Sequence, residues 1–153
     1  MTNACFFIIY SDELMERGSG ILMYISSFPA KYGIGTMGKE AFQFVDFLKK
    51  SGQKYWQILP IGPTSFGDSP YQSFSTFAGN PYFIDFDLLR EDGSLNLEDY
   101  SEIDWGNKPD RVDYEKIFKS RFKVLKAAYS RDRIRKKAEI DNFRFNHSYW
   151  IEN

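Results

Sequence analysis

The sequence has 153 residues, of which 20 are Lys or Arg and 21 are Asp or Glu, so its formal net charge is −1. This length, with 42% hydrophobic and 27% charged residues, is typical of one globular domain and excludes an intrinsically disordered chain. The near-zero charge argues against a general polyanion binder. The single cysteine, Cys5, excludes a disulfide within the chain, and the single histidine, His147, leaves no histidine-based metal site.

Nothing in the sequence predicts a membrane partner or a signal peptide. No run approaches the roughly 18 apolar residues that a membrane span needs. The apolar stretch 4–10 has no basic residues before it and is followed at once by Ser11, Asp12 and Glu13. We therefore expect a cytoplasmic protein.

Aromatic residues are unusually frequent, at 18% of the chain. Composition alone favours a large aromatic core. The alternative is a site that recognises flat or amphipathic ligands, and both interpretations stay open at this point.

The first predicted structural unit is strand, helix, strand. Residues 20–27 form a continuous apolar run, which is typical of a buried strand in a parallel sheet. Residues 55–59 predict a second strand, and apolar residues at helical spacing over 41–48 predict a helix between the two. Thr36 is the candidate N-cap of this helix, and Gly52 is the expected left-handed residue after its end. This order predicts a βαβ unit and an α/β fold.

Beyond the second strand, the pattern is a long loop followed by mostly helical structure. Residues 61–80 read as a loop, 80–85 as a short extended piece, and 87–91 as a brief helix closed by Gly93. An amphipathic helix follows, and a second one runs from about residue 132 to the end of the sequence. The apolar stripe expected to face the core on the first of these helices is Tyr114, Ile117, Phe118, Phe122, Leu125 and Tyr129.

The long loop is the segment with the strongest indication of function. Loops of this length are uncommon in compact domains unless they are functional or disordered, and four aromatic residues argue against disorder. Aromatic rings can stack on the apolar C–H face of a sugar, while Ser, Asp and Gln side chains bond to its hydroxyl groups. A sugar-binding loop and a loop that is merely packed both remain open from the residues alone.

Five segments of the sequence resemble one enzyme family in the same order and spacing. The family is that of the amylomaltases, which are 4-α-glucanotransferases, or disproportionating enzymes, of the α-amylase clan. The resemblance is dense over about residues 17–89 and looser beyond. The segments are Ser-Gly-Ile-Leu at 19–22, Tyr-Gly-Ile-Gly at 32–35, Tyr-Trp-Gln-Ile-Leu-Pro-Ile-Gly-Pro-Thr at 55–64, Gly-Asp-Ser-Pro-Tyr-Gln-Ser-Phe-Ser at 67–75 and Ala-Gly-Asn-Pro-Tyr at 78–82.

The resemblance implies a (β/α)8 barrel enzyme that transfers α-1,4-glucan segments between maltooligosaccharides, with retention and without a cofactor. In such a reaction one carboxylate attacks to form a glycosyl-enzyme, and a second acts first as acid and then as base. The implied partner is a maltooligosaccharide or a glucan derived from starch or glycogen. Two alternatives are a hydrolytic amylase-like glycosidase and a non-catalytic carbohydrate-binding module.

The chain is expected to supply the N-terminal part of such a barrel without closing it, because a barrel of this kind takes roughly 250 residues. The expected divisions are an extension without counterpart in the family at 1–16, the first barrel units at 17–106 and a basic helical segment, truncated, at 107–153. Met15 is an alternative start to Met1. We expect the chain alone to be inactive and marginally stable, because an open barrel leaves strand edges and apolar helix faces unpaired.

The resemblance assigns substrate contact to residues of the long loop. Ser69 and Tyr71 match family positions that line the cleft near the cleaved bond, and the Tyr71 ring is expected to pack against a glucosyl unit. Phe66 falls where relatives often carry Tyr, at a position associated with glucan binding away from the catalytic centre. Asp68 lies between these residues and is included among the expected substrate contacts. Tyr24 replaces a His that is common after the first strand.

No position in this sequence matches the catalytic carboxylates of the family, so no catalytic residue and no metal ligand is assigned. Asp68, Asp85 and Asp87 are expected to brace loops or cap helices. The basic residues near the C-terminus allow a nucleic-acid interpretation, but the acidic residues among them favour a solvated helix face, so no nucleic-acid partner is expected. These basic residues are Arg131, Arg133, Arg135, Lys136 and Lys137.

Overall fold

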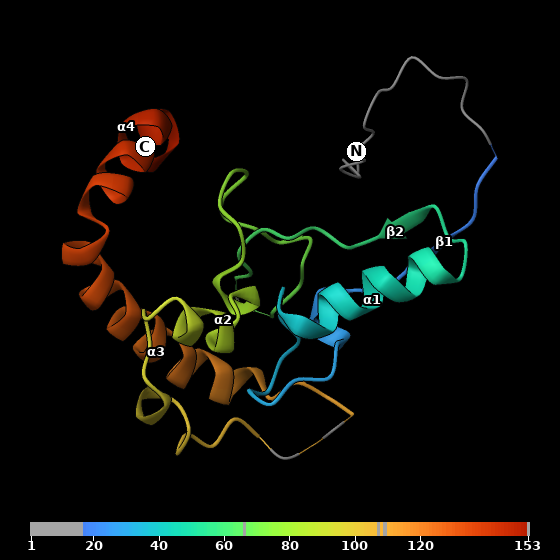
Figure 1. Ribbon diagram of the computed structural model, residues 1–153, viewed down its shortest axis with the longest axis horizontal. Helices are drawn as coiled ribbons and strands as arrows, with labels where there is room; N and C mark the ends of the chain where they lie inside the picture. The colour runs from blue at the N-terminus through green and yellow to red at the C-terminus, as the bar shows by residue number, and fades with distance from the viewer. Residues whose placement is uncertain (1–16, 66, 107, 109, 153) are drawn as a thin grey trace.

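The structure, a computed structural model, describes residues 17–65, 67–106, 108 and 110–152. The expected extension at 1–16, with the alternative start at Met15, lies outside these residues. The chain runs from a small β–α–β unit through a long loop to two consecutive helices on the opposite side (Figure 1). The helices and strands are β1 Gly20–Leu22, α1 Lys39–Lys50, β2 Tyr55–Gln57, α2 Phe86–Glu91, α3 Tyr114–Arg135 and α4 Lys137–Ile151.

The βαβ prediction is confirmed. β1 and β2 pair in parallel, with Gly20 opposite Tyr55 and Leu22 opposite Gln57, and α1 connects them. The pairing requires glycine at position 20, because a Cβ atom there would lie 2.5 Å from the carbonyl oxygen of Tyr55. A right-handed turn of chain through α1 is the usual way to bring two parallel strands together.

Both strands are shorter than predicted, and neither is buried. After Leu22 the amide of Met23 still donates to Gln57 O at 3.0 Å, but residues Ile25–Ser27 then form a 3₁₀ turn. Leu22 is 56% exposed. The apolar run was therefore wrongly interpreted as one buried strand: it supplies a half-covered strand of three residues and then a turn whose Ile25 enters the core.

The region between β1 and α1 is fixed by a part of the chain far along the sequence. Thr36 does not cap α1, whose N-cap is Gly38. Instead, Thr36 Oγ1 donates to Asp85 Oδ2 at 2.5 Å, and the amide of Met37 donates to Phe83 O at 2.9 Å. The prediction for the other end of the helix is confirmed, since Gly52 has a φ of +69° directly after the C-cap.

The segment 80–85 is a capped turn and not the extended piece predicted. Pro81–Phe83 form a 3₁₀ turn, and Asn80 Oδ1 accepts a hydrogen bond from the amide of Tyr82 at 2.9 Å. The brief helix that follows is confirmed as α2, and Gly93, with a φ of +78°, follows its end.

Helix α3 buries only part of the predicted stripe. Ile117 is buried, and Tyr114 and Leu125 pack against the core, but Phe118, Phe122 and Tyr129 are exposed. The buried positions continue through Val124 and Ala128 along an i, i+4, i+7 pattern that includes an arginine, Arg121. A charged residue in the middle of the buried face hides that face from a hydrophobicity pattern.

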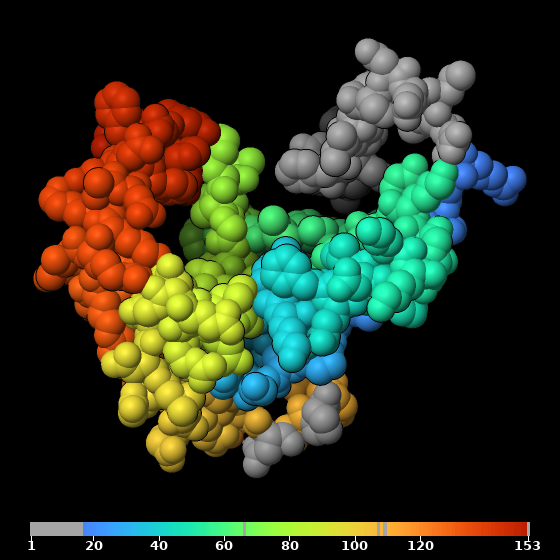
Figure 2. All heavy atoms as spheres, viewed as in Figure 1, coloured from blue at the N-terminus to red at the C-terminus, as the bar shows by residue number. Residues whose placement is uncertain are grey.

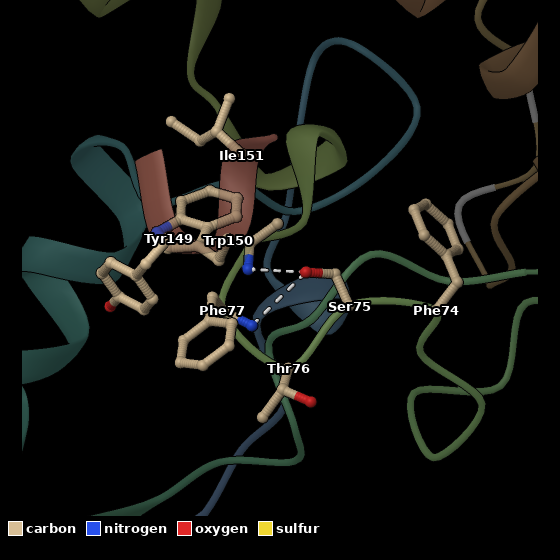
Figure 3. A pocket seen from close by; sticks show the side chains of 8 residues that line it. Phe74, Ser75, Thr76, Phe77, Tyr149, Trp150 and Ile151 are labelled. Carbon is tan, nitrogen blue, oxygen red and sulfur yellow. Dashed lines mark hydrogen bonds between the residues drawn. The ribbon is translucent and has the colours of Figure 1, made fainter. Parts of the chain in front are cut away.

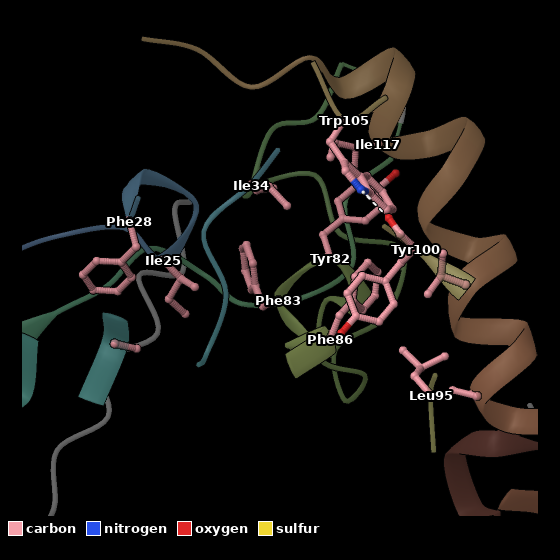
Figure 4. Close-up of a cluster of buried hydrophobic side chains, with 13 residues drawn as sticks. Ile25, Phe28, Ile34, Tyr82, Phe83, Phe86, Leu95, Tyr100, Trp105 and Ile117 are labelled. Atoms are coloured by element: carbon pink, nitrogen blue, oxygen red, sulfur yellow. Dashed lines mark hydrogen bonds between the residues drawn. The ribbon is translucent and has the colours of Figure 1, made fainter. Parts of the chain in front are cut away.

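The core is a cluster of aromatic and aliphatic side chains that comes from the 25–41 region, the turn at 81–83, α2, α3 and the segment that joins these two helices (Figure 4). Phe86 and Tyr100 are fully buried, and their ring centroids are 5.4 Å apart. Trp105 Nε1 donates to Tyr100 O at 3.2 Å, so the one polar atom of the indole is satisfied. The aromatic-core interpretation of the composition therefore holds for this part of the chain.

The basic end of α3 is paired with acidic residues from the α2–α3 connection. Arg131 forms two bonds to the Asp99 carboxylate, at 2.6 and 3.0 Å. Arg135 and Lys136 both contact Asp92. This pairing agrees with a solvated helix face. No helix in the described part of the chain is both long and apolar enough to cross a membrane.

Candidate functional site

The loop at 61–80 leaves the C-terminal end of β2 and returns to its own starting point. The amide of Asn80 donates to Ile61 O at 2.7 Å, and Thr64 and Ser73 form an isolated antiparallel bridge. Gly62 lies so close to this bridge that a Cβ atom would meet Ser73 Oγ at 2.5 Å. These contacts give the loop a closed base.

Serine hydroxyl groups hold the returning half of the loop. Ser73 Oγ donates to Ser75 O at 2.7 Å and accepts from the amide of Ser75 at 3.3 Å. Ser75 Oγ accepts from the amides of Phe77 and Ala78, at 3.4 and 3.1 Å (Figure 3). Short local bonds of this kind fix turns without secondary structure.

The tip of the loop has two consecutive residues in the left-handed region. Gly67 has a φ of +94° and Asp68 a φ of +54°. The amide of Asp68 donates to Ser65 O, and the amide of Gln72 donates to Ser69 O, both at 3.1 Å. Asp is among the few residues with a side chain that tolerate this backbone conformation.

The structure brings Ser69 and Tyr71 together at this tip. Ser69 Oγ accepts a hydrogen bond from the amide of Tyr71 at 3.3 Å. Tyr71 is 70% exposed, so its ring is open to a ligand and is not packed in the core. Phe66, the second aromatic contact predicted here, lies outside the described residues.

Asp68 is half-buried, and its charge acts on two tyrosines. Partial burial raises the pKa of the Asp68 carboxyl. Burial also raises the pKa of Tyr82 and of Tyr114, and the negative charge of Asp68 contributes to both shifts. A carboxylate in such surroundings can accept hydrogen bonds from hydroxyl groups.

Tyr24 joins this group from the end of β1. Its hydroxyl donates to Pro60 O at 3.4 Å. Burial raises the pKa of Tyr24 to about 12, with further contributions from Tyr114 and Tyr71. Tyr82 directly follows the loop in the sequence. Tyr114 was not predicted near the loop, because it lies far along the chain on α3 and no spacing pattern joins it to the loop.

Asp85 and Asp87 brace the fold, as expected. Asp85 Oδ1 accepts from the amide of Leu88 at 2.9 Å and caps α2. Asp87 Oδ1 accepts from the hydroxyl groups of Tyr32 and Tyr100, at 2.9 and 3.2 Å. Partial burial alone would raise the pKa of Asp87, but these two bonds and the charge of Lys31 lower it.

A buried arginine behind the loop was missed. Arg121 is fully buried, donates to Ile84 O and lies with its guanidinium carbon 4.2 Å from the centre of the Phe86 ring. Burial lowers the pKa of Arg121 to about 10. Its Nε and Nη1 atoms make no hydrogen bond within the described structure. Because α3 contains many charged residues, the sequence gave no indication that Arg121 is buried.

The described residues hold no group of three or more His, Cys, Asp or Glu arranged to bind a metal ion. The functional groups that the loop offers are therefore an exposed phenol ring, serine hydroxyl groups and one half-buried carboxyl. This set is able to bind a polyhydroxylated ligand and contains no pair of carboxylates placed for glycosidic bond cleavage.

Comparison with known proteins gives consistent matches. The family described as 4-alpha-glucanotransferase matches residues 23–153. A 4-alpha-glucanotransferase of Clostridium butyricum is 60% identical over 107 residues, 70% of this chain and 22% of that protein. The enzyme of that name from Streptococcus pneumoniae (strain TIGR4) is 47% identical over 140 residues, 91% of this chain and 28% of that protein.

A solved structure also matches. Amylomaltase from Streptococcus agalactiae, in complex with acarbose, superimposes with a TM-score of 0.83 at 47% identity, over 88% of this chain and 28% of that one. The chain thus spans about a quarter of the length of the relatives that it matches. Because the family match covers most of its residues, the chain belongs to the 4-alpha-glucanotransferase family.

Proposed function

We propose that the chain serves a 4-α-glucanotransferase that moves α-1,4-glucan segments between maltooligosaccharides. The observation that carries this proposal is the loop at 61–80, which presents the exposed Tyr71 ring and the Ser69 hydroxyl beyond the C-terminal end of β2. Sites in α/β folds lie at this end of the strands. The family match supports the identity of the ligand as a glucan.

In this proposal the loop binds and orients substrate. The Tyr71 ring packs on the apolar face of a glucosyl unit, and the Ser69 hydroxyl bonds to a sugar hydroxyl. The carboxyl group of Asp68 accepts a hydrogen bond from a second sugar hydroxyl. Phe66 is proposed to add a stacking surface. Fixing the glucan in this way lowers the entropic cost of bringing the scissile bond to the reacting groups.

The chemistry itself is proposed to be a retaining double displacement on two carboxylates that have no counterpart in this chain. Transfer prevails over hydrolysis when a sugar hydroxyl, and not water, occupies the acceptor position. We therefore propose that the chain alone is inactive and acts through the loop as one wall of the glucan cleft.

The remaining proposals concern the architecture and the setting. The likeness to the Streptococcus agalactiae amylomaltase supports a (β/α)8 barrel whose first units are formed by residues 17–106, with 107–153 as an appended helical segment. We propose a cytoplasmic location and a glucan partner, without nucleic acid, membrane or cofactor.

A chimera tests the proposed function. Residues 17–152 replace the matched quarter of the Streptococcus agalactiae amylomaltase, and the purified chimera is incubated with maltotriose. We expect glucose and longer maltooligosaccharides at constant total reducing ends. A steady rise in reducing ends supports a hydrolytic glycosidase instead. An inactive, folded chimera together with saturable maltoheptaose binding by the chain supports a carbohydrate-binding module.

A further inference from the structure

A second aromatic surface lies on the side of the loop that faces α4. Loop residues 74–78 and α4 residues 149–151 line a hollow of about 550 Å³, away from the Ser69–Tyr71 tip. The space-filling view shows the loop meeting the C-terminal end of α4 (Figure 2). The volume is in the range of small-molecule sites, which are commonly about 300 to 1,000 Å³.

The hollow has aromatic walls on both sides of Ser75. Phe74 lies on one side, and Phe77, Tyr149 and Trp150 gather on the other (Figure 3). The Phe77 ring stacks on Trp150, with centroids 6.0 Å apart and planes 25° apart, and meets Tyr149 edge-on at 5.4 Å. Phe74 remains 74% exposed and Phe77 60% exposed, so the rings keep wide surfaces open.

Polar groups lie between these rings. Ser75 Oγ is held by two backbone amides and still has its hydroxyl hydrogen to donate. The exposed Thr76 adds a second hydroxyl group to the same wall. No Asp, Glu, Lys, Arg or His side chain lines the hollow. A neutral ligand with apolar faces and hydroxyl edges fits this combination better than an ion or a purely apolar group.

Exposed aromatic rings also follow the loop from its tip to this hollow. Tyr71, Phe74 and Phe77 recur at every third residue, and each is at least 60% exposed. Hydroxyl-bearing residues, Ser73, Ser75 and Thr76, separate them. Such a series of exposed rings with hydroxyl groups between them suits an extended chain of sugar units.

We propose that the hollow between loop residues 74–78 and the end of α4 is a second glucan-binding site, which takes α-1,4-linked glucosyl units at a distance from Tyr71. The ligand class rests on the proposed function, whereas the site itself is carried by the ring geometry and the hydroxyl groups of the hollow. Trp150 and Phe77 supply the stacking surface, and Ser75 and Thr76 supply the polar contacts.

Assigned NMR spectra of the 153-residue chain, titrated with maltoheptaose, test this proposal. Trp56 Nε1 donates to Met23 O and Trp105 Nε1 to Tyr100 O, so their indole signals serve as internal references. We expect the Trp150 indole signal and the Thr76 amide to shift saturably, while the two reference signals stay in place. Cellohexaose, which is β-1,4-linked, should leave all of them unchanged.

The outcomes separate the two proposals. Shifts at Ser69 and Tyr71 without shifts at Trp150 and Thr76 overturn the second site and keep the proposed function. Shifts at Trp150 and Thr76 alone keep the second site and overturn the role of the loop tip. No shift at either place overturns both, and equal shifts with cellohexaose overturn recognition of the α-1,4 linkage.

Variants add a quantitative check. Trp150→Ala should weaken the maltoheptaose affinity measured at Thr76 about tenfold, and Trp150→Phe, which keeps a ring, less than threefold. Phe145→Ala is the matched control, because Phe145 is on the same helix and 81% exposed but does not line the hollow. The maltoheptaose affinity of the Phe145→Ala variant should stay within a factor of two of that of the unmodified chain. Equal affinities of all three variants would overturn the site.

Discussion

Thr36 and Asp85, 49 residues apart, are joined by a hydrogen bond of 2.5 Å between Thr36 Oγ1 and Asp85 Oδ2. The other carboxylate oxygen of Asp85 caps α2 through the amide of Leu88. One side chain thus ties the connection before α1 to the start of α2, directly after the segment in which the loop at 61–80 ends. This contact fixes where the loop returns to the fold.

Replacing Asp85 should therefore destabilise the chain through two contacts. Asp85→Ala removes the cap and leaves Thr36 without its acceptor, so we expect a loss of about 1 to 3 kcal/mol in the free energy of unfolding. Thr36→Val removes the shared bond alone and should cost about 1 kcal/mol. Urea unfolding followed by circular dichroism measures both. Equal losses for the two variants would show that the cap contributes nothing.

Arg121 should be replaceable by an apolar side chain of similar length. It is fully buried, and its Nε and Nη1 atoms have no partner in the described structure. Arg121→Met relieves these buried donors and keeps the packing on Phe86, so its stability should lie within about 1 kcal/mol of the wild type. Arg121→Ala opens a cavity and should cost about 2 to 4 kcal/mol. A Met variant as unstable as the Ala variant would show that the charge itself is needed.

Acid should weaken the contact between α3 and the preceding connection. The hydrogen bonds from Arg131 lower the pKa of Asp99 below 3.8, the usual value for this side chain. A carboxyl with a lowered pKa in the folded state stabilises it at pH values above the unfolded pKa. This stability is lost as the pH falls through the folded pKa. The free energy of unfolding should therefore decline below about pH 4.

Asp99→Asn tests the source of that decline. The amide cannot titrate, so the variant should be less stable at neutral pH and should lose less stability between neutral and acidic pH than the wild type. Unfolding in urea at several pH values gives the comparison. Parallel curves for the two proteins would assign the acid sensitivity to other carboxyl groups, such as Asp87 or Asp92, whose pKa values are also lowered.

The loop tip should tolerate glycine at position 68 and reject a β-branched residue. Asp68 has a φ of +54°, which Gly adopts freely and Val does not. Asp68→Gly should be as stable as the wild type or more so, and Asp68→Val less stable by about 1 to 2 kcal/mol. If the carboxyl contacts glucan, both variants lose maltoheptaose affinity. Unchanged affinity in Asp68→Gly would remove Asp68 from the proposed site.

The parts of the fold that local chemistry determines were predictable. The strand–helix–strand order followed from periodicity, and the left-handed residue after α1 followed from the position of Gly52. The length of β1 was not predictable, because the same apolar run serves a strand and then the buried Ile25 in a turn. The buried face of α3 was predicted only in part, because Arg121 occupies its centre.

The candidate site was likewise predictable only in part. Its position after β2 and its residues Ser69 and Tyr71 were predicted from one continuous segment of sequence, and their contact with substrate stays a prediction. The interaction of Asp68 with Tyr114 was not predicted, because Tyr114 lies on α3 and only the folded chain brings the two residues together. The contact of Phe77 with Trp150 joins residues 73 positions apart and is equally invisible to local patterns.

The most direct test of the account is the contribution of the Tyr71 ring to glucan transfer. In the chimera described above, Tyr71→Ala should lower kcat/KM for maltotriose at least tenfold, and Tyr71→Phe, which keeps the ring, less than threefold. Because the side chain is 70% exposed, neither change should alter the unfolding midpoint. A Tyr71→Ala chimera that transfers glucan as fast as the unmodified chimera would contradict the assignment of the loop as the glucan contact.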